Sequence, residues 1–131
     1  MAKTRKEIYE SRPLSPHLTI YKKQISSVLS IFHRLSGVGA YCGLSVISWW
    51  FILWVFSKFD PKYINFASDN IFFKLVVFGT VTAVFFHLCT GIRHLIWDTG
   101  RGFSIKCVNR TGIAAVCAFV VISLIFWMWV L

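Results

Sequence analysis

Residues 35–57 read LSGVGAYCGLSVISWWFILWVFS, and these 23 residues contain no charged side chain. A helix needs about 20 mainly apolar residues to cross the hydrocarbon core of a bilayer, which is about 30 Å thick. Two further stretches have the same character: residues 75–92, which are interrupted only by His87, and residues 111–131, which carry no charge. None of the three alternates between apolar and polar residues as the strands of a membrane β-barrel do. The sequence therefore predicts an all-α membrane protein with three transmembrane helices.

Residues that cap helices place the ends of these three helices at about 26–57, 70–98 and 111–131. A cap is a short polar side chain that accepts a hydrogen bond from one of the first free N–H groups of a helix. Ser26 or Ser27 can serve the first helix, Asp69 or Asn70 the second, and Thr111 the third.

The composition limits the classes of protein to which the chain can belong. Of its 131 residues, 56% are hydrophobic and 15% are charged, whereas soluble domains are nearer one quarter charged. The length fits one domain over residues 1–131. The net charge of +9 does not indicate a nucleic-acid partner here, because the apolar majority excludes a solvated basic module. The four cysteines form no CxxC pair, which argues against a zinc knuckle and a covalently attached haem.

The distribution of basic residues predicts the orientation of the helices. Residues 1–34 and 93–110 carry eleven Lys and Arg, and these two segments share one face of the membrane, whereas the other face has three. Basic loops stay on the cytoplasmic side, so we expect the N-terminus inside and the C-terminus outside. Residues 1–25 have no apolar run typical of a signal peptide, and Glu7 and Glu10 are unusual in a mitochondrial transit peptide. Because Pro13 and Pro16 disfavour helix, we expect this inner-side segment to be extended.

The second predicted helix has a polar face. His87, Gly91, His94 and Asp98 follow a 4-3-4 spacing that keeps them on one side of a helix. His87 is open to three interpretations: a hydrogen-bonding group between helices, a proton relay, or an axial ligand of haem iron. Gly91 leaves room for a flat macrocycle, but it would equally allow close packing of helices. The neighbouring Arg93 lies about 100° away from His94 around the helix and is expected at the inner interface.

The first predicted helix begins with a second polar group. Ser30, Arg34 and Gly37 lie on one stripe, with His33 beside it. Serine and arginine one turn apart can donate hydrogen bonds to a carbonyl oxygen or a carboxylate. The alternative is an arginine that reaches the lipid phosphates, with a serine that caps the helix. Five tryptophans cluster towards the outer ends of the first and third helices, as in the aromatic belt of a membrane interface: Trp49, Trp50, Trp54, Trp127 and Trp129.

Three motifs together resemble a known family. Residues 12–21 read RPLSPHLTIY, residues 30–37 read SIFHRLSG, and residues 87–98 read HLCTGIRHLIWD. Their order and spacing, SxxHRxxG followed some fifty residues later by HxxxGxRHxxxD, are similar to those of the cytochrome b556 subunits of succinate dehydrogenase. These proteins are one of the two membrane anchors of respiratory complex II. The resemblance covers nearly the whole chain, from Arg12 to the third helix.

This resemblance implies a fold and a set of sites. The three helices would pack with three helices of a second anchor subunit, and the two subunits would share one haem b with one histidine ligand from each. His87 matches the iron ligand. His33, Arg34 and His94 match residues near the haem propionates, and Ser30 with Arg34 matches the ubiquinone pocket. With a haem in this place, the basic side chains of Arg34 and Arg93 are expected to pair with its propionates. The flavoprotein and iron–sulfur subunits would dock on the inner side and supply electrons from succinate.

The resemblance also predicts a multi-pass protein of a bacterial cytoplasmic (inner) membrane or a mitochondrial inner membrane. Two other functions remain open from the residues themselves. One is a structural anchor without a redox role, in which the histidines only pack. The other is a small proton transporter that uses His87 and His94 as a relay. Haem content separates the redox anchor from both alternatives.

Overall fold

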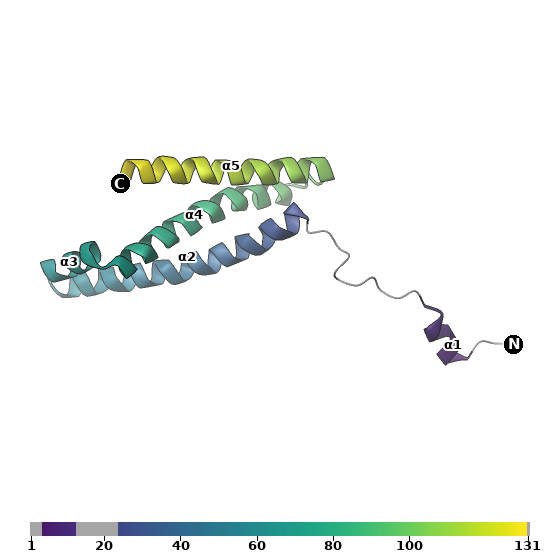
Figure 1. Ribbon diagram of the computed structural model, residues 1–131, viewed down its shortest axis with the longest axis horizontal. Helices are drawn as coiled ribbons and strands as arrows, with labels where there is room; N and C mark the ends of the chain where they lie inside the picture. Colours follow the sequence, from purple (N-terminus) through teal and green to yellow (C-terminus); the bar gives the residue numbers. More distant parts are fainter. Residues whose placement is uncertain (1–3, 13–23, 131) are drawn as a thin grey trace.

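The computed structural model describes residues 4–12 and 24–130, and these residues form five helices in chain order (Figure 1). The helices are α1 (Arg5–Glu10), α2 (Ile25–Phe56), α3 (Pro61–Asp69), α4 (Ile71–Asp98) and α5 (Ile105–Val130). Only α2, α4 and α5 among the described helices are long and apolar enough to cross a membrane. The prediction of three transmembrane helices is therefore confirmed.

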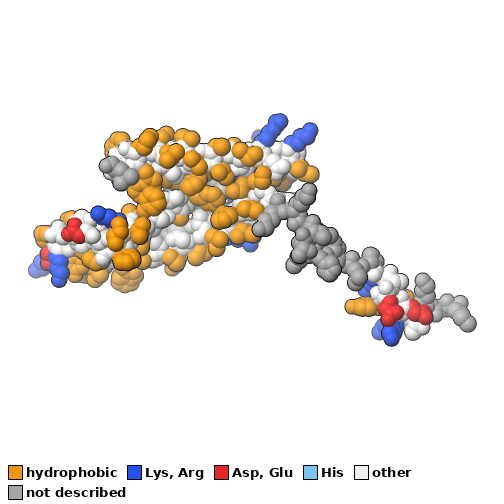
Figure 2. All heavy atoms as spheres, in the orientation of Figure 1, with side chains coloured by type: hydrophobic (Ala, Val, Ile, Leu, Met, Phe, Trp, Pro, Cys, Tyr) orange, Lys and Arg blue, Asp and Glu red, His pale blue; other side chains and the backbone are white. Residues whose placement is uncertain are grey.

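The surface of the three long helices is apolar. Figure 2 shows hydrophobic side chains covering these helices, with Lys and Arg gathered towards the two ends of the bundle. Large side chains such as Leu35, Leu95 and Leu124 are each more than half exposed, at 59%, 66% and 59%. Water would not tolerate so much exposed apolar surface on a monomer, whereas lipid does. The chain is a multi-pass membrane protein.

Close contact between α2 and α4 forms the centre of the bundle. The two helices run side by side, and α5 lies against α4 (Figure 1). At Gly43 of α2 the helices approach so closely that an added Cβ would collide with the side chain of Thr80 on α4. Small residues allow this approach in membranes, where packing replaces the hydrophobic effect as the force between helices. Both Gly43 and Thr80 are buried.

The third transmembrane helix begins six residues before the predicted start. Its first residue is Ile105 rather than Thr111, and the Thr111 hydroxyl donates to the carbonyl of Cys107 at 2.9 Å inside the helix. The prediction placed the start of the helix directly after Arg110, the last charged residue of the chain. Lys106 and Arg110 are exposed within the first turns, and long basic side chains can reach the interface from inside a helix. A charged residue therefore does not mark a helix end here.

The predicted cap is confirmed at α4, whereas those predicted for α2 and, as described above, for α5 are wrong. Asn70 caps α4, since its side-chain oxygen accepts the backbone N–H of Phe73 at 3.0 Å. At α2 the cap residue is Gln24, whose side chain makes no capping bond. Ser27 instead donates its hydroxyl to the carbonyl of Gln24 at 2.8 Å. Serine can bond the preceding turn as well as cap it, which the sequence does not distinguish.

Two short helices were not predicted. α3 follows a turn in which Lys58 and Phe59 have positive φ angles of 57° and 65°, and its cap Asp60 accepts the backbone N–H of Lys62 at 2.9 Å. α1 lies in the segment expected to be extended. Its start is held by the Glu7 carboxylate, which accepts the backbone N–H of Thr4 at 2.9 Å. The extended conformation expected around Pro13 and Pro16 lies outside the described residues.

Candidate functional site

Three histidines that are far apart in the sequence meet near the end of the bundle where α2 begins and α4 ends. The rings of His33 on α2 and His87 on α4 are stacked, with centroids 3.9 Å apart and planes 13° apart. The ring of His94, two turns further along α4, lies 4.8 Å from His33. All three side chains are half-buried. The structure thus joins the polar groups that the sequence placed on two separate helices.

Each of the two stacked rings lies over a glycine of the opposite helix. A Cβ added to Gly37 of α2 would come within 2.9 Å of Cε1 of His87. A Cβ added to Gly91 of α4 would lie 3.6 Å from Cε1 of His33. Each glycine follows the histidine of its own helix by four residues. Each helix therefore contributes one histidine ring and the glycine on which the other helix's ring lies. The space over Gly91 holds a histidine ring, which supports the close-packing interpretation of this glycine.

Hydrogen bonds select one tautomer of a neutral His87 ring. Its Nδ1 lies 3.0 Å from the backbone carbonyl oxygen of His33 and 3.3 Å from the Ser36 hydroxyl. A carbonyl oxygen only accepts, so Nδ1 must carry the proton and donate. The Ser36 hydroxyl itself donates to the same carbonyl at 2.7 Å, which leaves its oxygen free to accept from His87. Nε2 of a neutral His87 then presents a lone pair and has no hydrogen-bond partner among residues 4–12 and 24–130.

The His33 ring is fixed in a similar way by α4. Its Nδ1 lies 2.7 Å from the hydroxyl of Thr90, whose side chain is 1% exposed. The Thr90 hydroxyl also lies 2.8 Å from the carbonyl of Phe86, so it can donate there and accept from Nδ1 of His33, or donate to Nδ1 itself. On each helix, therefore, Nδ1 of the histidine is hydrogen-bonded by a group of the other helix.

These contacts come from a motif that occurs in both helices. Residues 33–37 read HRLSG and residues 87–91 read HLCTG, so each helix carries H-x-x-[S/T]-G. We call this arrangement the histidine lock: His33, Ser36 and Gly37 of α2 against His87, Thr90 and Gly91 of α4. The sequence interpretation missed Ser36 and Thr90, although comparing the two pentapeptides would have revealed them.

Ser30 and Arg34 lie on the flank of α2 beside the lock. Ser30 is half-buried and Arg34 is exposed, and neither side chain bonds another described residue. Their donors are therefore available to a ligand or a partner. Asp98, the last residue of α4, is also exposed and forms no ion pair within the described part of the chain.

Arg93 faces α5 rather than the histidines. Its Nη2 donates to the carbonyl of Val108 at 3.2 Å, and its Nε donates to the Thr111 hydroxyl at 3.4 Å. Its Cζ lies 3.9 Å from the ring centroid of Trp97, which is a cation–π contact. The side chain is 4% exposed, so its guanidinium packs against α5 and is not presented at the surface, where it was expected to meet propionates. The reason is that α5 begins early enough to cover it.

Comparison with known proteins places this geometry in a family. The model of the succinate dehydrogenase/fumarate reductase transmembrane subunit matches residues 9–126, which include the whole histidine lock. The chain belongs to this family. It is similar to the succinate dehydrogenase cytochrome b556 subunit of Rickettsia bellii (strain RML369-C), with 53% identity over 97% of this chain and 99% of the relative.

Two relatives named cytochrome b560 subunits are also similar to the chain. The cytochrome b560 subunit of Reclinomonas americana is 33% identical, with 89% of this chain and 85% of the relative covered. The mitochondrial cytochrome b560 subunit of Mus musculus is 35% identical, with 91% and 72% covered. The chain is thus a membrane subunit of an enzyme complex, and the family resemblance drawn from the three motifs is confirmed.

Proposed function

We propose that the chain is the membrane anchor of a succinate:ubiquinone oxidoreductase that holds haem b through His87 and helps to bind ubiquinone through Ser30 and Arg34. One observation carries the haem assignment: Nδ1 of His87 donates to a backbone carbonyl at 3.0 Å, and the Nε2 lone pair has no partner within the described part of the chain. Metal-binding histidines commonly use their second nitrogen in this way, because the bond fixes the ring and makes the ligand more basic.

The metal-binding residues present fit the iron of a haem better than a free metal ion. Residues 4–12 and 24–130 contain no group of three or more His, Cys, Asp and Glu able to hold a bare metal ion. A haem needs only axial ligands from protein, and His87 supplies one. The second would come from the second anchor subunit. When bound with two histidines, such a haem transfers electrons and has no open position for oxygen.

Positive charge near the lock suits the haem propionates. Arg34 is exposed and follows His33 in the chain, and the ring of His94 lies 4.8 Å from that of His33. Charge-assisted hydrogen bonds from arginine to a carboxylate are among the strongest in proteins. Arg34 is the donor of choice, since Arg93 is committed to α5.

Ser30 and Arg34 also fit a quinone carbonyl. They are one turn apart on α2, and their side chains have no partner among the described residues. A hydroxyl and a guanidinium that donate to a carbonyl oxygen stabilise the reduced forms of the quinone, because these carry more negative charge on oxygen.

The basic end of the bundle is proposed as the inner end, where the flavoprotein and iron–sulfur subunits dock. Eleven basic residues in segments 1–34 and 93–110, against three on the other side, support this orientation. A membrane-impermeant thiol reagent should label Arg5→Cys from the inner side and Lys58→Cys from the outer side. Labelling of Arg5→Cys from the outer side would reverse the orientation.

Clustering of His33, His87 and His94 gives a second candidate, a proton relay. A relay passes protons through both nitrogens of each ring. Nδ1 of His87 donates instead to a main-chain carbonyl, which cannot carry a proton onward. The geometry therefore favours a ligand over a relay.

Absorption spectra of the purified complex test the haem assignment. His87→Ala should remove or broaden the low-spin signal in the reduced-minus-oxidised spectrum, while the subunits still assemble. His94→Ala is the matched control on the same helix and should keep a low-spin haem. An unchanged spectrum in His87→Ala would transfer the ligand role to another residue, and a wild-type complex without haem would leave a purely structural anchor.

Two electron acceptors test the quinone assignment. Losing one hydrogen bond to a charged donor costs about 1.5–3 kcal/mol, which is roughly a 10- to 150-fold loss of rate. Ser30→Ala and Arg34→Ala should cut ubiquinone reduction by such factors and preserve succinate oxidation with an artificial acceptor that takes electrons upstream. Arg110→Ala, an exposed arginine of α5, is the control. A parallel fall in both activities would make Ser30 and Arg34 docking or folding residues.

A further inference from the structure

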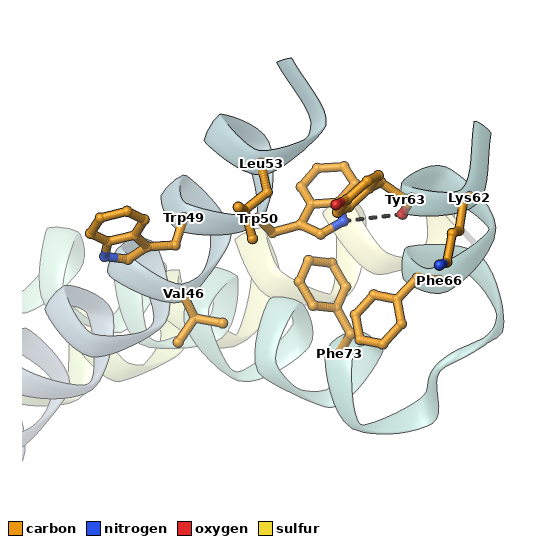
Figure 3. A pocket seen from close by; sticks show the side chains of 8 residues that line it. All are labelled: Val46, Trp49, Trp50, Leu53, Lys62, Tyr63, Phe66 and Phe73. Atoms are coloured by element: carbon orange, nitrogen blue, oxygen red, sulfur yellow. Dashed lines mark hydrogen bonds between the residues drawn. The ribbon is translucent and has the colours of Figure 1, made fainter. Parts of the chain in front are cut away.

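At the end of the bundle opposite the histidine lock, a groove of about 560 Å³ lies between α2, α3 and α4 (Figure 3). Trp49, Trp50 and Leu53 of α2 form one wall, and Tyr63 and Phe66 of α3 face them. Trp49 and Phe66 are 66% and 50% exposed, so the groove opens to the surroundings of the bundle. It is remote from the histidines and plays no part in the proposed electron transfer.

The floor of the groove consists of aromatic rings in contact and has little capacity for further hydrogen bonds. The Trp50 and Phe73 rings lie 5.3 Å apart, and Phe73 lies 5.9 Å from Phe66. The indole N–H of Trp50 donates to the backbone carbonyl of Tyr63 at 3.1 Å, which ties α3 to α2 and uses the donor. A ligand with several polar groups would find few partners here. An apolar chain fits such a surface better.

One cation lies at the edge of this apolar groove. Lys62 lines it and is exposed, and its ammonium forms no ion pair with any residue that the structure describes. The nearby Asp60 carboxylate is bonded to the backbone N–H of Lys62 instead. A lysine ammonium is a point charge that binds phosphate well. Tryptophan and tyrosine beside it are the residues that settle at the headgroup level of a bilayer.

We propose that this groove binds one anionic glycerophospholipid, with an acyl chain against Trp49, Trp50 and Phe66 and the phosphate at Lys62. The combination decides the occupant. An apolar trough alone would accept any hydrophobic molecule, and a lysine alone any anion. The two occur together at the membrane-boundary end of α2, where α3 forms the outer wall. The lipid would hold α3 against the transmembrane helices.

Photo-crosslinking in the assembled complex tests the proposal. The complex is placed in phosphatidylcholine nanodiscs that contain phosphatidylglycerol with a photoreactive acyl chain, and labelled peptides are identified by mass spectrometry. Phosphatidylcholine with the same chain is the second probe. We expect phosphatidylglycerol to label the segment from Val46 to Phe73 more strongly than phosphatidylcholine does.

Two variants and a control separate charge from shape. One lysine near an anionic headgroup is worth about a five-fold change in binding, so Lys62→Gln should lower phosphatidylglycerol labelling by that factor. Lys58→Gln removes an exposed charge at the same end that does not line the groove, and it should change nothing. Val46→Phe should fill the trough and reduce labelling by both probes.

Three results would overturn the proposal. Equal labelling by the two lipids in wild type and Lys62→Gln would show no headgroup selection. An equal loss in Lys58→Gln would indicate general surface charge. Absence of label in the groove would indicate that another subunit covers it. The haem spectrum of each variant, measured on the same samples, reports on His87 separately, so failure of the lipid site is distinguishable from failure of the redox proposal.

Discussion

The two ends of the bundle hold their helices together by different means. At the histidine lock, α2 and α4 approach until rings rest on glycines, and buried hydroxyls bond imidazoles. At the other end, the helices are joined by aromatic rings, such as Trp50 and Phe73, with α3 inserted as a third wall. The first arrangement depends on atoms meeting at short distances. The second arrangement is less tightly packed, as its groove shows, so it should tolerate substitutions better.

The largest effect is expected where the polar end is also tied to α5. Arg93→Ala removes a 4% exposed guanidinium with two hydrogen bonds and a ring contact, and leaves a cavity. We expect a loss of about 3–5 kcal/mol, by analogy with large buried truncations. Thermal unfolding of the purified complex measures it. Arg93→Lys keeps the charge but not the paired geometry, so it should fall between Ala and wild type. A stable Ala variant would mean that α5 is held by other contacts.

A smaller loss should follow from filling the glycine contact of the lock. Gly37→Val places carbon where Cε1 of His87 lies 2.9 Å from an ideal Cβ, so the ring must move. Overpacking of this kind costs about 1–3 kcal/mol. The low-spin haem signal should broaden as well. Gly39→Val is the control on the same helix, since nothing lies within 4 Å of its added Cβ. Equal damage from both variants would place the critical surface between this chain and its partners.

Removing one hydroxyl from the lock should cost less again. Thr90→Val keeps the shape of the side chain but removes the hydroxyl that bonds Nδ1 of His33. Hydrogen bonds between membrane helices contribute about 0.6 kcal/mol on average, and we expect a loss of that size. Thr90→Ser should restore it. Thermal unfolding of the three forms checks this order, and an unstable serine variant would show that the methyl group, not the hydroxyl, matters.

The smallest effect is expected at the aromatic end. Trp50→Phe removes the indole N–H that bonds the Tyr63 carbonyl, but water at the interface can replace it. We expect a loss of about 0.5 kcal/mol or less in global stability, at the low end for hydrogen bonds. Faster hydrogen exchange in α3 should nevertheless be visible. Trp49→Phe, at an exposed ring of the same helix, should leave exchange in α3 unchanged. A Trp50→Phe loss as large as that of Arg93→Ala would contradict the proposed difference between the ends.

The transmembrane helices could be predicted because a bilayer offers no water to a broken backbone, so each span must be one long apolar helix. The short α3 escaped prediction because nine residues with both charges and aromatics look like a loop. For the site, the sequence could predict only which residues share one face of a helix. His33, His87 and His94 were singled out, but their meeting depends on how far α2 slides along α4. The direction of the Arg93 side chain depends on where α5 begins. The prediction placed that start too late, at Thr111, because it used only the absence of charge.

The repeated H-x-x-[S/T]-G motif has a consequence for how the helices find each other in the membrane. Helices that insert separately can slide along one another until side chains interlock. Moving α2 by one turn, about 5.4 Å, would bring the His87 ring against Tyr41 or His33 instead of Gly37. Both rings lose their glycine and both hydroxyls lose their imidazole in the same step. The pair of motifs therefore specifies a single register of α2 against α4, and both motifs belong to this chain.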